Sequence, residues 1–443
     1  MFLLTHPHPH TLTHHPRGQA VLRILQSALQ AVEPQAAVRH FIERREQTLI
    51  VDGHKYYLDK FEQILLLGLG KASQAMTLPL LNLLADHAPR GLLIPKQAPV
   101  QLLSRLDIQQ GGHPVPNENS IRAGEKALHL VSGLNENDLL ICLISGGGSA
   151  LMSAPLPGIS LADLRELTSA LLACGARIDE INTLRRHLDQ LKGGGLARLA
   201  SPARIVSLIL SDVVGNPLET IASGITTPDP STRQDALKVL EKYQLTGKVA
   251  STILHALQTF PETPKPSDPL FERVQNVIVG SNTQAAEAAL EQARREGFCS
   301  HFLGDDWQGE ACEVSQKLCN LLHESELPRP FCLVAGGETT VTLRGGGRGG
   351  RNQELALAAV RNLAGIQDVL LVTLATDGED GPTDAAGAVV SSETYQRGLS
   401  IGLSPETFLA DNDAYTYFSN LNDLLKTGPS GTNVNDLAFC FGF

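Results

Sequence analysis

Short, continuous apolar runs recur along this chain, and most of them end in glycine or in a small or acidic polar residue. Alanine- and leucine-rich stretches of helical composition separate the runs. Apolar strands that alternate with helices are typical of parallel sheets covered on both faces, so the predicted fold class is α/β. Ligands of such sheets bind at the carboxyl ends of the strands. The runs cover residues 64–70, 91–95, 138–148, 205–212, 274–282, 331–339 and 369–381.

The chain has 443 residues, whereas a single hydrophobic core stops growing at roughly 250–300 residues, so more than one domain is expected. Histidine- and proline-rich residues 1–17 are expected to form a mobile, non-catalytic tail. We expect an N-terminal domain over 18–258 and a C-terminal region over 259–443. The proline-rich stretch 259–272 marks this boundary, although it equally fits a loop within one domain.

Two local patterns near the N-terminus predict secondary structure. Apolar residues at helical spacing predict a helix from about residue 18 to residue 45. The pair Asp52-Gly53 between two strand-like segments predicts a hairpin with a two-residue turn.

Composition excludes several classes of protein. The sum of 36 basic and 47 acidic residues gives a net charge of −11, which argues against a general binder of nucleic acid or of anionic membranes. No run approaches the roughly 20 apolar residues of a membrane span. Seven cysteines without a Cys-x-x-Cys pair argue against a disulfide framework or a zinc knuckle, and favour a cytoplasmic location.

Two glycine clusters follow predicted strands and suit an anion. In GLGKAS (68–73), backbone N–H groups and Lys71 lie before a predicted helix. This is not a P-loop, because Leu65 stands where the first glycine should be, and a tight turn with a solvated lysine remains the alternative. In SGGGSA (145–150), three successive glycines between two serines favour a nest of donors for phosphate over a purely packing role.

A third glycine cluster spans residues 336–358. Gly345, Gly347 and Gly350 satisfy the dinucleotide-binding pattern, but glycine density alone produces that match, and no acidic residue follows a second strand at the required distance. The arginines Arg348 and Arg351 make this segment a better candidate for a flexible anion-binding loop. A disordered surface loop is the alternative.

Acidic residues end two other predicted strands. Asp212 and Asp377 stand where Mg²⁺ is commonly held beside phosphate groups, although each could instead cap a turn or a helix, and Glu338 has the same two interpretations. His113, in a proline-flanked loop, is either a proton-transfer group or a structural residue.

The ordered motifs resemble a known family, the class II glycerate 2-kinases with a C-terminal MOFRL domain, which older usage often calls hydroxypyruvate reductases. The resemblance runs from about residue 18 to the C-terminus. It rests on the segments GLGKAS, GGHPVPNENS, LISGGGSALM, INTLRRHLDQLKGGGLA, LILSDVVGNPLETIASGITTPDPST, GSNTQAA, AGGETTVTLRGGGRGGRNQELALA, TDGEDGPTDAAGA and GTNVNDL.

The resemblance implies ATP- and Mg²⁺-dependent phosphorylation of D-glycerate to 2-phosphoglycerate. It also implies two α/β domains, a Rossmann-like parallel-sheet domain and a MOFRL domain over about 330–438, with the active site in the cleft between them. Lys71 and Arg351 match the family's essential polar pair.

We therefore expect a catalytic set, a metal set and a binding set. Lys71, Arg351 and Asp212 are the expected catalytic residues, and Asp377 and Asp212 are expected to hold Mg²⁺, with their exact division of labour left open. Substrate and nucleotide contacts are expected from Gly70, Ser73, Ser145, Gly146, Gly147, Gly148, Ser149, Asn282, Glu338, Gly347, Arg348 and Asn352.

Two other functions compete with the kinase. An NAD(P)H-dependent hydroxypyruvate reductase fits the glycine hexamer but lacks its acidic ribose-binding residue. A non-catalytic sensor of a phosphorylated sugar acid needs no acidic strand ends, although it could retain them. The expected partners are D-glycerate and ATP, with no nucleic acid and no membrane, and a homodimer stays open.

Overall fold

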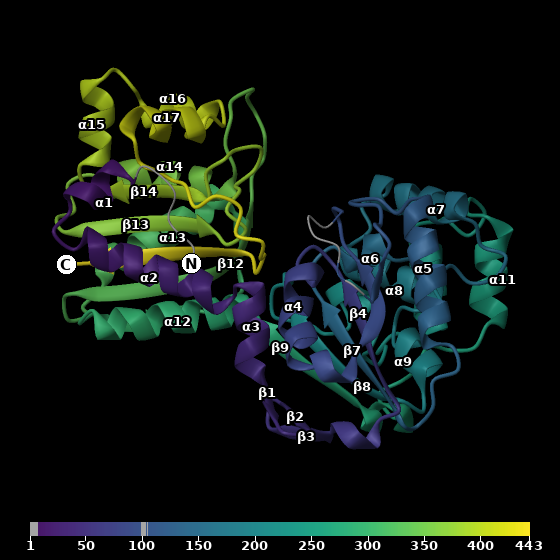
Figure 1. The fold of residues 1–443 in the computed structure, drawn as a ribbon. Coiled ribbons are helices and arrows are strands. Elements are labelled where there is room, and N and C mark those ends of the chain that lie inside the picture. The colour runs from purple at the N-terminus through teal and green to yellow at the C-terminus, as the bar shows by residue number, and fades with distance from the viewer. Residues whose placement is uncertain (1–7, 99–102, 104) are drawn as a thin grey trace. The chain divides into compact units, whose positions relative to one another are not determined.

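The computed structural model describes residues 8–98, 103 and 105–443. Contacts divide the chain into two compact units. The central unit comprises Ala37–Ser211 and Asn216–Val279, and the terminal unit comprises the residues up to Ala36, Asp212–Gly215 and Gly280–Phe443. Each unit is built on its own sheet, shown with its element labels in Figure 1.

The central unit is built on a six-stranded sheet with the strand order β6-β5-β4-β7-β8-β9. The pairs from β6 to β8 are all parallel, which confirms the predicted parallel sheet of the N-terminal domain. The strands are β4 (Gln63–Leu69), β5 (Arg90–Ile94), β6 (Leu106–Ile108), β7 (Asp138–Ile144), β8 (Arg204–Leu210) and β9 (Val274–Gly280).

Helices flank this sheet on both faces (Figure 1), which explains why its strands are continuously apolar. Every residue of β7 is buried. The helices are α4 (Ser73–Leu83), α5 (Glu118–Val131), α6 (Gly148–Leu151), α7 (Leu161–Ala173), α8 (Ile178–His187), α9 (Gly195–Ala200), α10 (Arg233–Lys242) and α11 (Ser251–Thr259). Short 3₁₀ turns cover Leu58–Lys60, Ala85–His87, Ile221–Ser223 and Pro269–Arg273.

A small antiparallel sheet precedes β4. It consists of β1 (Ile42–Arg45), β2 (Thr48–Val51) and β3 (His54–Tyr57). Asp52 (φ +46°) and Gly53 (φ +78°) join β2 to β3, and the two positive φ values are those of a type I′ hairpin turn. The predicted hairpin is therefore confirmed.

The single helix predicted from about residue 18 to residue 45 is wrong. The structure has α2 (Gly18–Ala31), then α3 (Pro34–Phe41), and then the strand β1. Pro34 has no N–H to continue α2, but its fixed φ suits the first position of a new helix. The apolar periodicity continues across residues 32–33, so the periodicity alone did not predict the break between α2 and α3.

The terminal unit is built on a mixed sheet of order β10-β12-β16-β13-β14-β15, with β11 also paired to β12. The last strand of the chain, β16, lies antiparallel between β12 and β13. The strands are β10 (Cys299–Phe302), β11 (Trp307–Glu310), β12 (Phe331–Thr340), β13 (Val369–Ala375), β14 (Gly387–Ser391), β15 (Leu424–Leu425) and β16 (Asp436–Gly442).

Both faces of this sheet are covered as well. Leu333, Leu371 and Cys440 are in register and pack in one core cluster with residues of α13 and α14. On the other face, the ring of Phe441 lies 5.8 Å from the ring of Phe298, which follows α12. The helices are α12 (Asn282–Arg295), α13 (Ala311–Glu324), α14 (Arg351–Asn362), α15 (Thr394–Ser400), α16 (Pro405–Ala410) and α17 (Ala414–Leu421).

The N-terminal segment is an ordered part of the terminal unit from helix α1 (His10–His14) onward, so the expected mobile tail is wrong for these residues. Leu12 is only 1% exposed. Thr11 donates from its N–H (2.8 Å) and its hydroxyl (3.0 Å) to the buried carboxylate of Asp423, which also pairs with Arg397. The proline and histidine content of this segment predicted a solvated tail, but Leu12 is buried and Thr11 bonds to Asp423.

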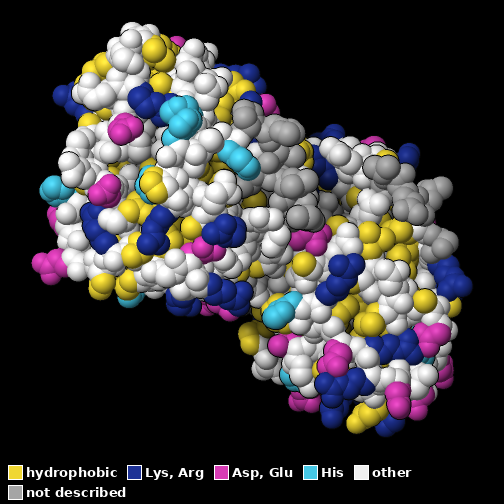
Figure 2. All heavy atoms as spheres, turned by 60° about the vertical axis from the view of Figure 1, so that its left-hand side comes forward, with side chains coloured by type: hydrophobic (Ala, Val, Ile, Leu, Met, Phe, Trp, Pro, Cys, Tyr) yellow, Lys and Arg dark blue, Asp and Glu magenta, His cyan; other side chains and the backbone are white. Residues whose placement is uncertain are grey.

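Contacts place the division between the two units near residue 280. The chain passes from the central to the terminal unit at residues 279 and 280, beyond the proline-rich stretch, and α2 belongs to the terminal unit, where it packs along α12. On the face shown in Figure 2, basic and acidic side chains are intermixed. None of the described helices is long and apolar enough to cross a membrane.

Replacing Leu12 by alanine tests whether the N-terminal segment stabilises the terminal unit. The variant removes a fully buried side chain and leaves a cavity, so we expect Leu12→Ala to lower the free energy of unfolding by about 2–4 kcal/mol. Thr13→Ala, an exposed position on the same helix, is the control and should change it by less than about 0.5 kcal/mol. Equal stability of the two variants in denaturant titrations would show that the segment is not part of the core.

Candidate active site

The loops that follow β4 and β7 are fastened to each other in the central unit. The N–H of Ala72 donates to the Ser145 hydroxyl (2.9 Å), and the N–H of Lys71 donates to the Gly146 carbonyl (3.0 Å). Gly70 has a φ of +120°, and a Cβ at this position would lie 2.3 Å from the Ser145 hydroxyl. Only glycine permits this approach, so Gly70 and Ser145 hold the two loops together.

The glycine loop, residues 145–149, leaves its own amides open. Among the described residues, the N–H groups of Gly146, Gly147, Gly148 and Ser149 have no hydrogen-bond partner. Gly147 has a φ of +85°, which turns the chain there. Successive amides without acceptors form a concave donor set that suits an oxyanion. The structure therefore brings Gly146, Gly147, Gly148 and Ser149 together as sequence analysis expected.

Lys71 adds a positive charge beside the glycine loop. Its side chain is exposed and forms no ion pair within the described part of the chain. Ser73 is different: its buried hydroxyl donates to the Gly70 carbonyl (2.8 Å), so it shapes the turn at the start of α4.

His113 lies against the same loop. A Cβ on Gly147 would lie 3.0 Å from His113 Cδ2, 3.2 Å from His113 Nε2 and 3.6 Å from Lys71 Cγ. Burial lowers the pKa of His113 from its usual value, and the nearby charges of Lys71 and Lys96 lower it further. Sequence analysis had left a structural role open for this histidine, because nothing in a single sequence shows that its loop reaches Gly147.

A strained segment supports the glycine loop from another side. Ala222 (φ +49°), Ser223 (φ +59°) and Gly224 (φ +63°) are successive left-handed residues, which is costly for the two that carry side chains. The hydroxyls of Ser223 and Ser149 lie 2.8 Å apart. A Cβ on Gly148 would lie 2.8 Å from that of Ala222. Strain of this kind clusters at functional sites.

The terminal unit carries a second polar cluster, centred on Arg351 at the first residue of α14. The Arg351 guanidinium pairs with Asp436 at the start of β16 and with Glu338 near the end of β12. Burial raises the pKa of Asp436 to about 7, against the lowering effect of Arg351. Burial alone would lower the pKa of Arg351, but the two carboxylates raise it well above its usual value. Sequence analysis missed Asp436, although it lies in the motif GTNVNDL.

Neighbouring side chains hold this cluster in place. Asn282 donates from Nδ2 to the carbonyls of Val434 (3.0 Å) and Asp436 (2.9 Å), so it positions the start of β16. The buried Asp380 carboxylate accepts from the N–H groups of Asn352 (3.1 Å) and Gln353 (2.8 Å). The N-terminus of α14 is therefore already capped by a carboxylate.

The glycine-rich loop at residues 344–348 differs from the loop in the central unit. The N–H groups of Arg344 and Gly345 donate to the Asn412 side chain, and that of Gly347 donates to the Asp411 carbonyl (2.9 Å). The N–H of Arg348 donates to Asp413 (3.0 Å), and its guanidinium lies 4.3 Å from the centre of the Tyr415 ring. Acceptors from another segment thus occupy the amides that were expected to bind phosphate.

The predicted metal ligands are less closely defined. Asp212 follows β8 but is grouped with the terminal unit, which also contains Asp377 at the end of β13. The Asp377 carboxylate accepts from the N–H of Glu379 (3.1 Å). The described residues contain no group of three or more potential ligands, but Mg²⁺ in kinases commonly uses one or two carboxylates with water and phosphate. The donor chemistry of these aspartates therefore fits Mg²⁺.

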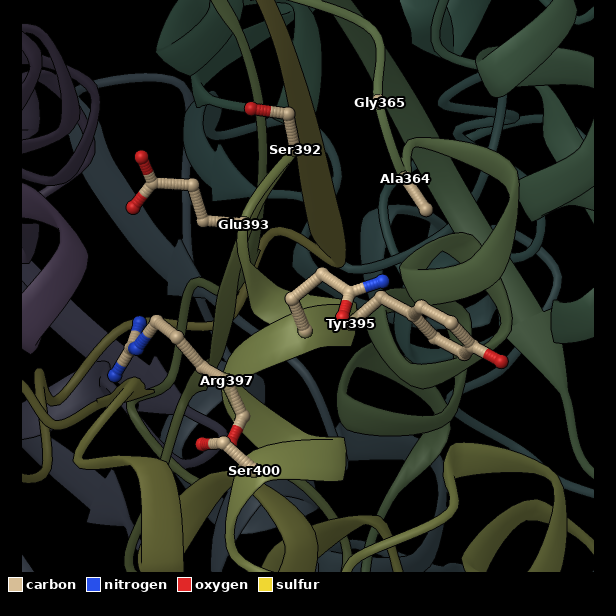
Figure 3. A pocket seen from close by; sticks show the side chains of 8 residues that line it. Ala364, Gly365, Ser392, Glu393, Tyr395, Arg397 and Ser400 are labelled. Carbon is tan, nitrogen blue, oxygen red and sulfur yellow. The ribbon is translucent and has the colours of Figure 1, made fainter.

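A separate pocket of 610 Å³ lies beside α15 in the terminal unit (Figure 3) and contains none of the expected site residues. Figure 3 shows the Arg397 guanidinium and the Tyr395 hydroxyl pointing in opposite directions. Because Arg397 pairs with Asp423 and donates to the Leu421 carbonyl, the pocket lacks a free cation for an anionic ligand.

Comparison with known proteins identifies the family. The model for a domain of unknown function, DUF4147, matches residues 20–258, and the MOFRL family model matches residues 331–436. The chain is 39% identical over 422 residues to D-glycerate 2-kinase from Thermotoga maritima, with coverage of 94% of this chain and 96% of that protein. The chain belongs to the glycerate 2-kinase family.

A further relative and a solved structure agree with this assignment. Glycerate 2-kinase from Pyrococcus horikoshii is 39% identical over 427 residues, which is 94% of this chain and 95% of that protein. The crystal structure of glycerate kinase from Thermotoga maritima matches with a TM-score of 0.87 at 38% identity, covering 96% of this chain and 99% of that one.

Gly147→Ala tests the open amides of the glycine loop. The added methyl group requires a strained backbone and meets the His113 ring, so we expect binding of inorganic phosphate to weaken by about tenfold or more. The control is Gly133→Ala, which has a similar φ of +78° with open space around the position. Calorimetric titration should show that Gly133→Ala binds phosphate like the wild type, because its backbone strain lies outside the glycine loop; equal weakening in both variants would contradict a specific role for the loop amides.

Proposed function

We propose that this chain is an ATP-dependent glycerate 2-kinase that transfers a phosphoryl group to the C2 hydroxyl of D-glycerate. The observation that carries the proposal is the set of unpartnered amides at Gly146–Ser149 beside the unpaired Lys71. This arrangement supplies the donors and the positive charge that phosphoryl transfer requires. The proposed acceptor, D-glycerate, follows from the relatives that are named glycerate 2-kinases.

In this proposal the central unit binds and polarises an oxyanion. The glycine loop takes phosphate oxygens, and Lys71 neutralises the transferring phosphoryl group or the glycerate carboxylate. Catalysis is then mainly positioning and charge stabilisation, because phosphoryl transfer needs little covalent chemistry from the protein.

The terminal unit contributes Arg351 and the carboxylates. Arg351, held by Glu338 and Asp436, acts on the carboxylate or the phosphoryl group. Asp212 and Asp377 are proposed to hold Mg²⁺, which neutralises charge on the phosphate oxygens when bound. Asn282, Gly347 and Asn352 then act by shaping this unit, since the bonds described above occupy the donor groups in question. The expected active-site cleft stays a prediction.

A hydroxypyruvate reductase has less support. A dinucleotide places its pyrophosphate at open amides of a glycine-rich loop before a helix. Here Asp380 caps α14, and residues 411–413 provide acceptors for the N–H groups of residues 344–348, so these amides are not open to a pyrophosphate within the described structure. We propose a cytoplasmic location as well, since all seven cysteines are free. A homodimer stays a prediction.

The kinase is tested by coupling ADP release to a colour reaction with D-glycerate, ATP and Mg²⁺. We expect steady turnover, a loss of at least about a thousandfold in Lys71→Ala and Arg351→Ala, and unchanged melting temperatures. Lys55→Ala and Arg361→Ala are the controls, the first an exposed lysine of the central unit and the second an exposed arginine on the same helix as Arg351. NADH oxidation with hydroxypyruvate, in place of ADP release, would refute the kinase.

The pKa of Asp436 predicts an acid limb in the activity profile. The carboxylate form pairs with Arg351, and protonation below about pH 7 weakens that pair, so kcat/KM should fall by about tenfold for each pH unit below this value. Asp436→Asn cannot titrate and should show lower activity at pH 8 without this limb.

Asp384→Asn is the matched control for this pH profile. Asp384 pairs with Lys426 on the surface, and its pKa is lowered through hydrogen bonds from Lys426 and Tyr415. The control should keep the wild-type profile. An identical acid limb in Asp436→Asn would assign the titration to ATP or to another group.

A further inference from the structure

His113 is held close to the glycine loop by the packing of its own segment. A Cβ on Gly111 would lie 2.1 Å from the Leu151 carbonyl oxygen, so this segment runs directly against the end of α6. The N–H of Gly112 donates to the buried Ser120 hydroxyl (3.0 Å), which also accepts from the N–H of Asn117 (3.1 Å). The segment before His113 is thus held at two points, by the contact of Gly111 with Leu151 and by the bond of Gly112 to the capped N-terminus of α5.

The imidazole presents its Cδ2–Nε2 edge to Gly147. The contact is so close that Gly147 could not carry a side chain without displacing the ring, and the stem of Lys71 lies on the same side. Within the described part of the chain, neither ring nitrogen has a hydrogen-bond partner. Buried polar groups are normally hydrogen-bonded, so a half-buried imidazole without a partner, next to unpartnered amides, can donate to a bound ligand.

The groups around Nε2 determine what kind of ligand it would meet. The neighbouring loop offers N–H groups, Lys71 offers an ammonium group, and the described loop residues 145–149 contain no carboxylate. A ligand that satisfies all of these donors must present several acceptor oxygens and negative charge. This requirement describes a phosphate or a carboxylate and excludes a cation.

We propose that His113 is a direct ligand of the oxyanion bound by the glycine loop, with Nε2–H as the donor. The proposal deepens the proposed function, since the oxyanion would be a phosphate of ATP or the carboxylate of glycerate. It assigns to His113 a contact with the bound substrate beside the amides and Lys71.

The contact has a consequence for pH. Burial, Lys71 and Lys96 favour the neutral ring in the free protein. A bound anion favours the charged ring, so proton binding and anion binding reinforce each other. A rise of one unit in the His113 pKa on anion binding corresponds to about tenfold tighter binding by the protonated protein.

Inorganic sulfate is the probe, because its charge is constant over this range. We expect calorimetric titrations of the wild-type protein to show about tenfold tighter sulfate binding at pH 5.5 than at pH 8. His113→Gln keeps a donor near the Nε2 position but cannot titrate, so its affinity should match the wild type at pH 8 within about twofold and stay flat at lower pH.

Two further variants separate contact from structural support. Lys71→Gln should bind sulfate more weakly at every pH and keep the pH dependence, because His113 is intact. His113→Phe fills the same space without a donor and should bind weakly at every pH, with a melting temperature close to that of His113→Gln. A pH dependence in His113→Gln equal to that of the wild type overturns the proposal.

Turnover assays then identify the oxyanion. Competition of sulfate with ATP assigns the contact to phosphate, and competition with D-glycerate assigns it to the carboxylate. Loss of turnover in His113→Gln with an unchanged sulfate profile would make the imidazole a proton acceptor for the glycerate hydroxyl, contrary to the proposal. The sulfate titrations need no turnover, so a failure of the kinase function would leave their result intact.

Discussion

The central unit depends on a close approach of two strand-end loops that only glycine allows. Neighbouring parallel strands β4 and β7 deliver both loops to the same edge of the sheet. There, the Gly146 carbonyl accepts from the N–H of Lys71, and the Ser145 hydroxyl accepts from the N–H of Ala72. Because those bonds are satisfied from within the loop pair, the amides that follow have no acceptor. Their unpaired state makes this loop the candidate site for an oxyanion.

The two glycine-rich loops of this chain show that glycine content alone does not identify an anion site. The amides of residues 344–348 resemble those of residues 145–149 in sequence, but Asp411, Asn412 and Asp413 supply acceptors for them. These residues follow α16, more than 60 positions further along the chain. A loop whose amides are saturated from outside is rigid and shapes its surroundings, whereas a loop with open amides can bind a ligand.

Local signals in the sequence predicted much of the fold. The apolar runs predicted β4, β5, β7, β8 and β9 of the central sheet but only β12 and β13 of the terminal sheet, and Asp52-Gly53 predicted the hairpin, because these features depend on neighbouring residues. Long-range contacts escaped prediction. Thr11 bonds to Asp423, 412 residues further along the chain, and β16 enters the middle of a sheet antiparallel to its neighbours.

The candidate site divides in the same way. Lys71, Arg351 and the glycine loop stood out because their residue types suit anions in any arrangement. Asp436 was missed and the role of His113 stayed open, because an aspartate or a histidine gains its role from burial and from its neighbours, and neither is visible in one sequence. Their partners, Arg351 and Gly147, are 85 and 34 residues away.

The two polar clusters differ in charge, and this difference follows from their acceptors. In the central unit, the amides of residues 146–149 lie beside Lys71 and His113, whose pKa is lowered by burial, and the described residues 145–149 include no carboxylate. In the terminal unit, Arg351 pairs with the carboxylates of Glu338 and Asp436, and burial raises the pKa of Asp436 to about 7. That cluster can change its charge by one proton under physiological conditions. A kinase needs both properties, since one part must hold a highly charged phosphate chain and another must tolerate a metal ion and a proton released from a hydroxyl.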